Sequence, residues 1–374
     1  MKIKGYLNDK DMNDDFLNKK INERKAQNAF RQLRLPEGKI DFCSNDYLGI
    51  VKNDLIGRRS SDVGHRLGST GSRLLSGNYL LIEETEKQIA IFHEAEAGLI
   101  FNSGYDANVG LLSCVPQRGD TILYDYLSHA SIRDGIRLSF ANSFSFAHND
   151  LYDLEKKLVV AKGNIFVVTE SVFSMDGDFA PLYEIIFLCE KYHAYLIIDE
   201  AHATGVIGEK GAGLVQQLNL QQKCFARVHT FGKAVGCHGA IVLGSEKLRD
   251  YLINFSRAFI YTTSLPEASV AAIQEAYRIF PGLDFERNHL QQLIVQFQNS
   301  EIAFEKFKST TPIQVVIIPG NEEVKRIAHQ LQENNFDVRP IVYPTVPKGS
   351  ERLRIVLHSF NISEEIGLLI EKLV

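Results

Sequence analysis

The stretch AYLIIDEAHATG (residues 194–205) decides the fold class of this chain. Its first half is a short apolar run and its second half is polar and small, which predicts a buried strand followed by a functional loop. The same arrangement recurs in three more stretches: AGLIFNSGYDAN (97–108), DTILYDYLSHAS (120–131) and NIFVVTESVFSMDG (164–177). Helix-sized segments separate the runs, which is typical of buried parallel strands with crossover helices. Ligands bind beyond the carboxyl ends of such strands, so we expect the four polar segments to meet at one site.

Composition narrows the class of protein. With 374 residues the chain is too long for one compact core, so we expect two domains and a terminal arm. A formal charge of −5 without a basic stripe argues against a nucleic-acid partner. No apolar run approaches the length of a membrane span, and the polar, acidic N-terminus fits neither a secretory signal nor a transit peptide. Five scattered cysteines without a CxxC pair favour the reducing cytoplasm and argue against disulfides or structural zinc.

The N-terminal part is predicted to be helical. Residues 14–34 have the pattern of a charged amphipathic helix that Pro36 and Gly38 end. LLIEETEKQIAIFHEA (80–95) also has helical spacing, and another helix follows Pro266. The apolar positions expected on the first helix are Phe16, Ile21, Ala29, Phe30 and Leu33.

The pattern changes after a break at FPGLDF (280–285). We expect strands in TPIQVVIIPG (311–320), FDVRPIVYPTVP (336–347, with a turn) and SERLRIVLH (350–358), and helices in NEEVKRIAHQLQENN (321–335) and SEEIGLLIEKLV (363–374), the last with a Ser/Glu capping start. The chain is therefore predicted to divide into a helical arm (1–40), a large domain (41–282) and a smaller C-terminal α/β domain (283–374).

One alternative interpretation of the central stretch is a nucleotide-driven motor. LIIDEAH (196–202) has the letters of a Walker B box, but such a motor also needs GxxxxGK(S/T) earlier in the chain. The Gly232–Lys233–Ala234 triplet lies downstream and lacks both the hydroxyl and the leading glycine. The sequence therefore disfavours a motor.

Pyridoxal phosphate explains the same letters better. Asp199 ends a predicted strand, His202 follows at Asp-x-x-His spacing, and Lys233 comes 34 residues after Asp199, with Thr230 three positions before the lysine. This cofactor is held by a lysine as a Schiff base and has an acidic partner on its pyridine nitrogen. Asp199 would keep that nitrogen protonated, and His202 would bind the phenolic oxygen.

Two further features suit this cofactor. Thr230 and the backbone amides of Gly104 and Tyr105, at the mouth of a predicted helix, suit a phosphate dianion. Lys233 with an ordinary pKa of about 10.4 would be a charged, poor nucleophile, whereas desolvation and cofactor attachment would let it act as amine and general base.

Each of these signals also has an ordinary structural explanation. An isolated Asp-x-x-His is more often a helix cap, and His129 in LSHAS would more often be a loop histidine than a ring-stacking partner. Ser174 and Thr230, taken singly, are typical of helix or turn caps. Their joint placement at strand ends of one α/β domain favours the functional interpretation.

The longer motifs around these residues resemble those of a known family, the α-oxoamine synthases, which are pyridoxal-phosphate enzymes of fold type I. The resemblance runs from about residue 14 to the C-terminus and implies a large domain with a mostly parallel sheet plus a smaller C-terminal α/β domain. It is carried by SNDYLG (44–49), GSTGSRLLSGN (68–78), DYLSHAS (125–131), FAHND (146–150), VTESVFSMDGDFAPL (168–182), DEAHATGVIGEKGAG (199–213), TFGKA (230–234), YTTS (261–264) and PTVPKGSERLR (344–354).

The resemblance implies a transferase acting in biotin biosynthesis. SNDYLG, MDGDFAPL and the Ala201–His202 pair are similar to the branch that condenses L-alanine with a pimeloyl thioester, on CoA or acyl carrier protein, with loss of carbon dioxide. A sibling reaction, with glycine or serine and another acyl-CoA (glycine C-acetyltransferase, for example), is the alternative.

The resemblance also implies roles for individual residues. Lys233, Asp199, His202 and His129 would form the catalytic set, with His129 stacked on the cofactor ring and Ser174 joining His202 at the ring oxygen. Thr262 and Thr263 would reach the phosphate of the neighbouring subunit, because the family builds each site at a homodimer interface. Gly104, Tyr105 and Thr230 would hold the phosphate of their own subunit; Asn45 and Arg354 the amino-acid carboxylate; Arg31, Thr345 and Glu170 the acyl substrate.

Two departures from the family pattern concern the acyl pocket. Cys237 and His238 stand where relatives vary, and Asn361 stands where a histidine is usual. Neither departure affects the residues expected around the cofactor.

Overall fold

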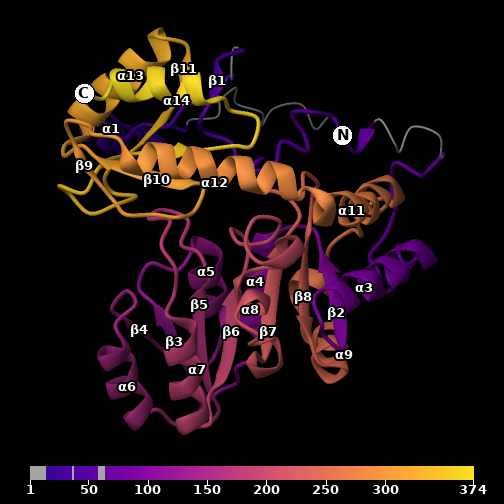
Figure 1. The fold of residues 1–374 in the computed structure, drawn as a ribbon. Helices are drawn as coiled ribbons and strands as arrows, with labels where there is room; N and C mark the ends of the chain where they lie inside the picture. The colour runs from indigo at the N-terminus through magenta and orange to yellow at the C-terminus, as the bar shows by residue number, and fades with distance from the viewer. Residues whose placement is uncertain (1–13, 36–37, 58–63) are drawn as a thin grey trace, which may run out of the picture.

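A seven-stranded sheet forms the centre of the molecule (Figure 1). The structure is a computed structural model and describes residues 14–35, 38–57 and 64–374. Along the sheet the strand order is β2-β8-β7-β6-β5-β3-β4, and β8 alone runs in the direction opposite to the other strands. The mostly parallel α/β sheet expected from the sequence is confirmed. Its strands are β2 (Ala97–Phe101), β3 (Thr121–Asp125), β4 (Asn142–Phe146), β5 (Ile165–Glu170), β6 (Tyr195–Asp199), β7 (Ala226–Thr230) and β8 (Ala240–Gly244).

Both faces of this sheet are covered by helices, because successive side chains of each strand point to opposite sides. In β6, Ile197 packs into one buried cluster, whereas Leu196 and Ile198 pack into the other. The first cluster is completed by α4 (Gly104–Cys114), α5 (Ala130–Leu138), α9 (Glu246–Phe255) and α10 (Arg257–Ile260). The second is completed by α3 (Leu80–Phe92), α6 (Leu151–Val160), α7 (Leu182–Lys191), α8 (Leu214–Gln217) and α11 (Glu267–Ile279).

The C-terminal part has its own sheet, of order β12-β13-β10-β9, with antiparallel neighbours. The long helix α12 (Asp284–Asn299) runs alongside this sheet and above the large one (Figure 1). The strands and helices expected between residues 311 and 374 are confirmed. They are β10 (Ile313–Ile317), α13 (Asn321–Glu333), β11 (Phe336–Asp337), β12 (Arg339–Ile341), β13 (Arg352–Val356) and α14 (Ser363–Glu371), with β9 (Glu305–Lys306) before them.

The start of α14 differs in detail from the expected Ser/Glu cap. Ser363 is already the first helical residue, and its hydroxyl donates to Gln296 Oε1 at 2.9 Å. Glu365 performs its half of the motif, since its Oε2 accepts from the Ile362 backbone N–H at 3.2 Å.

The N-terminal helix is shorter than the sequence predicted. A 3₁₀ turn (Asp15–Leu17) leads into α1 (Asn18–Ala26), and the chain then leaves the helix at Asn28, whose φ of 54° is left-handed. The expected apolar face is also wrong, because Phe16 and Leu33 are 79% and 103% exposed. Pro36, the expected stop signal, lies outside the described residues.

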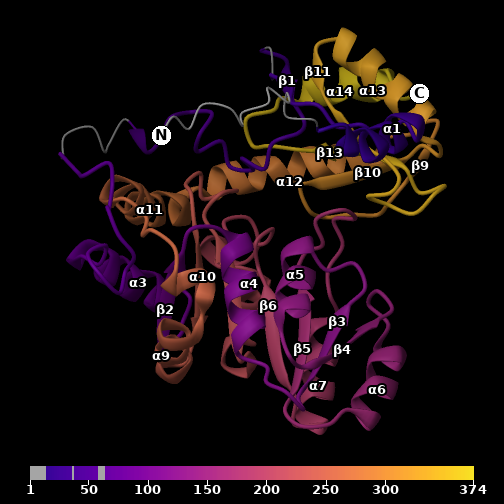
Figure 2. The same ribbon diagram turned by 180° about the vertical axis from the view of Figure 1, so that it is seen from behind.

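The segment after α1 lies along the C-terminal part instead. Asn321 Nδ2 donates to the Gln27 carbonyl at 2.8 Å, and Figure 2 shows α1 beside α13. Further on, β1 (Ile40–Asp41) pairs in parallel with β11. Chain segments from opposite ends of the sequence therefore meet above the large sheet.

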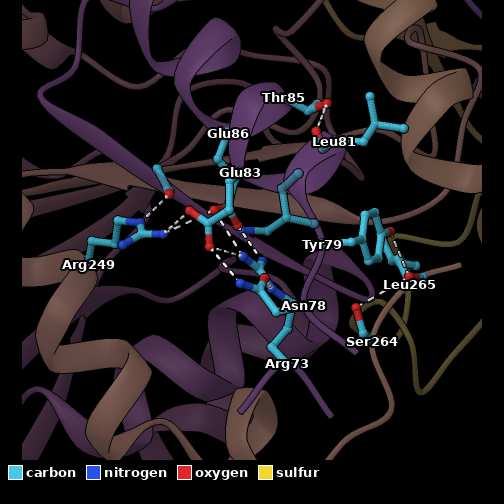
Figure 3. Close-up of polar contacts among 12 residues, drawn as sticks. Arg73, Asn78, Tyr79, Leu81, Glu83, Thr85, Glu86, Arg249, Ser264 and Leu265 are labelled. Carbon is cyan, nitrogen blue, oxygen red and sulfur yellow. Dashed lines mark hydrogen bonds and ion pairs between the residues drawn. The ribbon is translucent and has the colours of Figure 1, made fainter. Parts of the chain in front are cut away.

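A buried ion pair ties the GSTGSRLLSGN segment to α3 (Figure 3). Arg73 Nη1 donates to Glu86 Oε1 at 2.6 Å, and the same oxygen accepts from the Ile100 N–H of β2 at 2.8 Å. Arg249 of α9 approaches the other Glu86 oxygen at 3.3 Å. Loop, helix and sheet are thus joined at one carboxylate.

Among the described residues, no helix combines the length and the apolar character needed to cross a bilayer.

Candidate functional site

The polar segments that follow the strands meet at the carboxyl edge of the large sheet. Asp199, at the end of β6, is 7% exposed, and both of its carboxylate oxygens have donors. Asn108 Nδ2 donates to Oδ2 at 2.7 Å, and the Ala201 backbone N–H donates to Oδ1 at 2.8 Å. The carboxylate is therefore held in one orientation.

Lys233 lies beside this carboxylate because the loop between β7 and β8 is tightly turned. The Gly236 N–H donates to the Lys233 carbonyl at 2.8 Å, and Gly236 has a φ of 66°. A Cβ at Gly236 would lie 2.6 Å from Ile50 Cγ2, so only glycine fits there. The flanking Ala234 and Val235 are buried, which fixes the base of the lysine.

A chain of hydrogen bonds runs from Lys233 to Asn45. Lys233 Nζ lies 2.7 Å from His202 Nε2, and His202 Nδ1 lies 2.7 Å from the Tyr47 hydroxyl, which donates to Asn45 Oδ1 at 3.1 Å. Since an ammonium only donates, His202 Nε2 accepts and Nδ1 carries the proton. Burial and the nearby Lys233 charge hold the pKa of His202 well below its usual value, so its imidazole is neutral.

Burial and the neighbouring carboxylates shift the pKa of Lys233 in opposite directions. Burial lowers the pKa of its ammonium, while the Asp199 and Glu170 carboxylates oppose that shift. For Glu170, burial and the neighbouring Asp199 charge raise the pKa, and its Oε1 accepts from the His129 N–H at 2.6 Å. The site therefore favours a neutral amine on Lys233 more than water does.

Arg354 joins the C-terminal sheet to this site. From β13, its Nη2 donates to Asn45 Oδ1 at 3.0 Å and its Nε donates to the Ser174 carbonyl at 2.7 Å. Asn45 and Arg354 thus come together as expected. Ser174 meets this arginine through its backbone.

The N-terminus of α4 lies against Thr230. Ser103 caps the helix, with its Oγ accepting from the Asp106 N–H at 3.0 Å. A Cβ at Gly104 would lie 3.5 Å from Thr230 Oγ1, so the Thr230 hydroxyl faces the first turn of the helix. First-turn amides have no intrahelical partner, which makes this a suitable place for an anion. The exposed Tyr105 side chain donates instead to Asp134 Oδ2 at 2.5 Å.

His129 has a structural role at the start of α5. It is the N-cap of α5, and its Nδ1 accepts from the Ser131 N–H at 3.2 Å. The cap uses one ring nitrogen, and His129 is exposed.

Two predicted pairs lie apart from the Lys233–Asp199 cluster in this chain. Asn102 Nδ2, next to the start of α4, donates to Thr262 Oγ1 and to the Thr263 carbonyl, both at 2.9 Å. Arg31 Nη2 donates to Thr345 Oγ1 at 3.2 Å, and both side chains are exposed.

The departures from the family pattern have structural explanations. Burial raises the pKa of the Cys237 thiol to about 12, so it is no nucleophile at neutral pH. Asn361 is 1% exposed and caps its own turn, its Oδ1 accepting from the His358 N–H at 2.9 Å.

Sequence reasoning missed two polar residues of the site, Tyr47 and Asn108. Tyr47 stands inside SNDYLG and is fully buried, and burial raises the pKa of its hydroxyl to about 12. Asn108 lies four residues after Gly104, one helical turn along the same face of α4. That spacing was the available signal for Asn108.

Comparison with known proteins defines the class. The chain belongs to the aminotransferase class I and II family, whose model matches residues 37–372. The predicted resemblance to fold-type-I enzymes is confirmed.

Individual members of this family show which enzymes the chain is similar to. The chain is 41% identical to the 8-amino-7-oxononanoate synthase of Emericella nidulans, over 96% of this chain and 94% of the relative. The structure of 8-amino-7-oxononanoate synthase from Francisella tularensis aligns with a TM-score of 0.75 and 29% identity, over 90% of this chain and 97% of that one. A structure of SPT with PLP aligns with a TM-score of 0.85 and 26% identity, over 92% of this chain and 90% of that one.

Proposed function

We propose that this chain is a pyridoxal-phosphate-dependent acyltransferase that condenses L-alanine with a pimeloyl thioester, on CoA or acyl carrier protein. The products are 8-amino-7-oxononanoate, carbon dioxide and the free thiol, a step of biotin biosynthesis. The observation that carries the proposal is the Lys233 amine, which lies 2.7 Å from His202 Nε2 and is influenced by the charge of the fixed Asp199 carboxylate, in a chain whose relatives carry this activity in their names.

The described residues fit the cofactor. Asp199 has both oxygens oriented by donors, as a fixed partner for a pyridine nitrogen requires. The first turn of α4 and the Thr230 hydroxyl suit its phosphate. When bound, pyridoxal phosphate supplies an electron sink for the electron pair released at the substrate α-carbon.

Lys233 would transfer the α-proton of the substrate, and its neighbours would position the cofactor. Lys233 would hold the cofactor, and its amine would remove the substrate α-proton, for which a lowered pKa is suited. His202 and Ser174 would lie on the side of the cofactor's phenolic oxygen, and the ring of His129, at the N-cap of α5, would stack on the cofactor ring.

Arg354 and Asn45 would bind the amino-acid carboxylate. The guanidinium is already oriented by Asn45 and by the Ser174 carbonyl, and its planar fork matches a carboxylate. Glu170 would face the thioester carbonyl, and its raised pKa suits a group that donates a hydrogen bond there. Arg31 and Thr345 would contact the acyl chain or its carrier.

The homodimer, the domain division and the cellular location are part of the same proposal. A homodimer would let Thr262 and Thr263 reach the phosphate in the neighbouring subunit, and Gly104, Tyr105 and Thr230 would serve their own. The division at residues 282/283 is supported by the separate large and C-terminal sheets, whereas β1 (Ile40–Asp41) spans the division proposed at residues 40/41 and pairs with β11 of the C-terminal part. A cytoplasmic location stays a prediction from the scattered cysteines.

The second candidate is a sibling reaction with serine or glycine, favoured by the alignment with SPT. A matrix of amino acids against acyl thioesters on the purified protein separates the two. We expect the highest kcat/KM with L-alanine and a pimeloyl thioester. A preference for serine or glycine with another acyl group would transfer the proposal to the sibling, and a colourless protein indifferent to pyridoxal phosphate would remove both.

A further inference from the structure

His148, in the FAHND motif, lies between two carboxylates outside the site described above. Its Nδ1 is 3.0 Å from Asp125 Oδ1, and its Nε2 is 2.8 Å from Asp178 Oδ2. Carboxylates only accept, so both ring nitrogens carry protons and the ring is an imidazolium. Asp125, at the end of β3, is fully buried and also accepts from the Leu127 N–H at 2.7 Å.

The surroundings support this charge. Burial alone would lower the pKa of His148, but its hydrogen bonds to Asp125 and Asp178 raise it to about 10. The ring packs edge-on against Phe173, with ring centroids 4.4 Å apart. The other charged groups nearby, Asp176 and Arg352, pair with each other.

Asp178 belongs to a tight turn that starts at Phe173. The Phe173 N–H donates to the Asp178 carbonyl at 3.0 Å, and the Gly177 N–H donates back to the Phe173 carbonyl at 2.9 Å. His148 therefore holds one end of a compact unit to the large sheet. The turn contains Ser174, whose carbonyl accepts from Arg354 Nε at 2.7 Å.

The C-terminal part also binds this turn. The Gly177 carbonyl accepts from Ser309 Oγ at 2.8 Å and from Thr311 Oγ1 at 3.0 Å. Arg352, two residues before Arg354 on β13, pairs with Asp176. The turn is thus the element through which the large sheet sets the position of Arg354.

We propose that His148 is a positioning residue: as a fixed cation between Asp125 and Asp178, it holds the turn of residues 173–178 so that the Ser174 carbonyl orients the Arg354 guanidinium for the amino-acid carboxylate. This inference rests on the proposed function, because Arg354 is assigned to the carboxylate there.

A metal ion is the other occupant that these side chains suggest. One ligand atom each of His148, Asp176 and Asp178 lies within 4.8 Å of the others. Both nitrogens of His148 are already directed at carboxylates, however, and Asp176 is paired with Arg352. The imidazolium and the guanidinium supply the positive charge here, so we assign no metal.

His148→Gln in the holoenzyme tests the proposal. Glutamine is neutral and leaves Asp125 and Asp178 without a shared cation, so the turn moves and Arg354 loses its orientation. We expect the KM for L-alanine to rise about tenfold, with the KM for the acyl thioester unchanged, because only carboxylate binding is lost. Asp178→Asn should give the same selective change, and it serves alone if His148→Gln does not fold.

The matched control is His289→Gln, which removes a histidine whose Nε2 lies 2.9 Å from the Asn361 carbonyl, outside the turn. It should leave both KM values unchanged. Equal increases of the two KM values in His148→Gln and Asp178→Asn, or no increase, would overturn the positioning role. A wild-type protein without activity on L-alanine would overturn the proposed function instead.

A second measurement is independent of activity. The ring ¹⁵N signals of His148, assigned by their loss in His148→Gln or their shift in Asp178→Asn, should report two protonated nitrogens from about pH 6 to pH 9. A ring that loses a proton near the ordinary value of about 6.5 would contradict the imidazolium and with it the proposal.

Discussion

At the scale of single residues, the site depends on how Lys233 is surrounded. Its nearest polar neighbour, His202 Nε2, accepts from it, and the two oxygens of the nearby Asp199 carboxylate accept from Asn108 Nδ2 and the Ala201 N–H. The lysine amine is thus available in the site, while the oxygens of the neighbouring Asp199 carboxylate accept hydrogen bonds from other groups. Replacing Lys233 tests the role of the amine in turnover, and replacing Asn108 tests how the Asp199 carboxylate is held.

Lys233→Ala should abolish steady-state turnover, because no other described lysine lies beside Asp199 and His202. The far-UV circular dichroism and the unfolding temperature should stay close to wild type, since the side chain contributes one hydrogen bond at the site edge. Lys223→Ala, which removes an exposed lysine paired with Glu190, is the control and should retain activity. Appreciable turnover by Lys233→Ala contradicts the assignment.

The pH dependence of cofactor attachment follows from the lowered pKa of Lys233. Only the neutral amine attacks the aldehyde, so a lowered pKa brings the attachment rate to its plateau at a lower pH than an ordinary lysine would. Stopped-flow absorbance on the apo-protein, followed from pH 6.5 to 10, should give a midpoint clearly below about 10.4. A midpoint at or above that value would mean that burial does not control this amine.

Asn108→Ala should destabilise the protein by about 1–3 kcal/mol, because the buried Asp199 Oδ2 loses its donor. Urea unfolding of the apo-protein measures this change in the free energy of unfolding. Asn254→Ala removes an exposed amide that bonds only the Asp250 carbonyl nearby and should have little effect. Equal stability of the two variants would show that the Asp199 carboxylate finds another donor.

At the scale of elements, the strands predicted for the large sheet were runs of apolar letters, although the apolar run AIVLG of β8 was also missed. Runs such as AGLIF agree with β2 residue for residue. β4 was missed because NSFSF is polar and largely exposed, and β7 because ARVHT carries Arg227 and His229, both buried in this chain. The N-terminal helix was predicted too long because the apolar periodicity of the sequence continues past Asn28, where the backbone is left-handed.

Helix α3 contains a charge that its sequence pattern could not place. Glu86 is 2% exposed, and its partner Arg73 lies 13 residues earlier, in a loop. Helical spacing puts Glu86 on the same face as the buried Ile82 and Ile89, but it does not identify the group that compensates a charge there. The ion pair is therefore a tertiary feature that only the structure reveals.

Arg73→Met should destabilise the protein by about 3 kcal/mol, because Glu86 keeps a buried charge with weaker compensation from Arg249 and the Ile100 N–H. Chemical unfolding monitored by circular dichroism measures the change. Arg326→Ala, which breaks an exposed pair with Glu323, should leave the midpoint almost unaffected. Similar midpoints for the two variants would mean that the buried pair contributes no more than a surface pair.

At the scale of the whole molecule, the site is assembled from segments that sequence spacing does not connect. Asn45 comes from the N-terminal region, Ser174 from the loop after β5 and Arg354 from the C-terminal sheet, yet two hydrogen bonds join them. Strand-end patterning predicted the part around Asp199 and His202. The meeting of Asn45 with Arg354 was expected only from the family resemblance, because antiparallel pairing in a distant sheet places that arginine.

Sharing of the site between subunits can be tested with two different inactive chains. If Thr262 and Thr263 serve the neighbouring subunit, a dimer of one Lys233→Ala chain and one Thr262→Val/Thr263→Val chain contains one damaged site and one site built wholly from unaltered groups. Co-expressed with two tags and purified through both, this heterodimer should have about half of the wild-type activity. Each homodimer should be nearly inactive, since one lacks the amine and the other two phosphate hydroxyls. A heterodimer no more active than its parent homodimers would mean that each subunit completes its own site, and that Asn102 holds Thr262 and Thr263 for the fold alone.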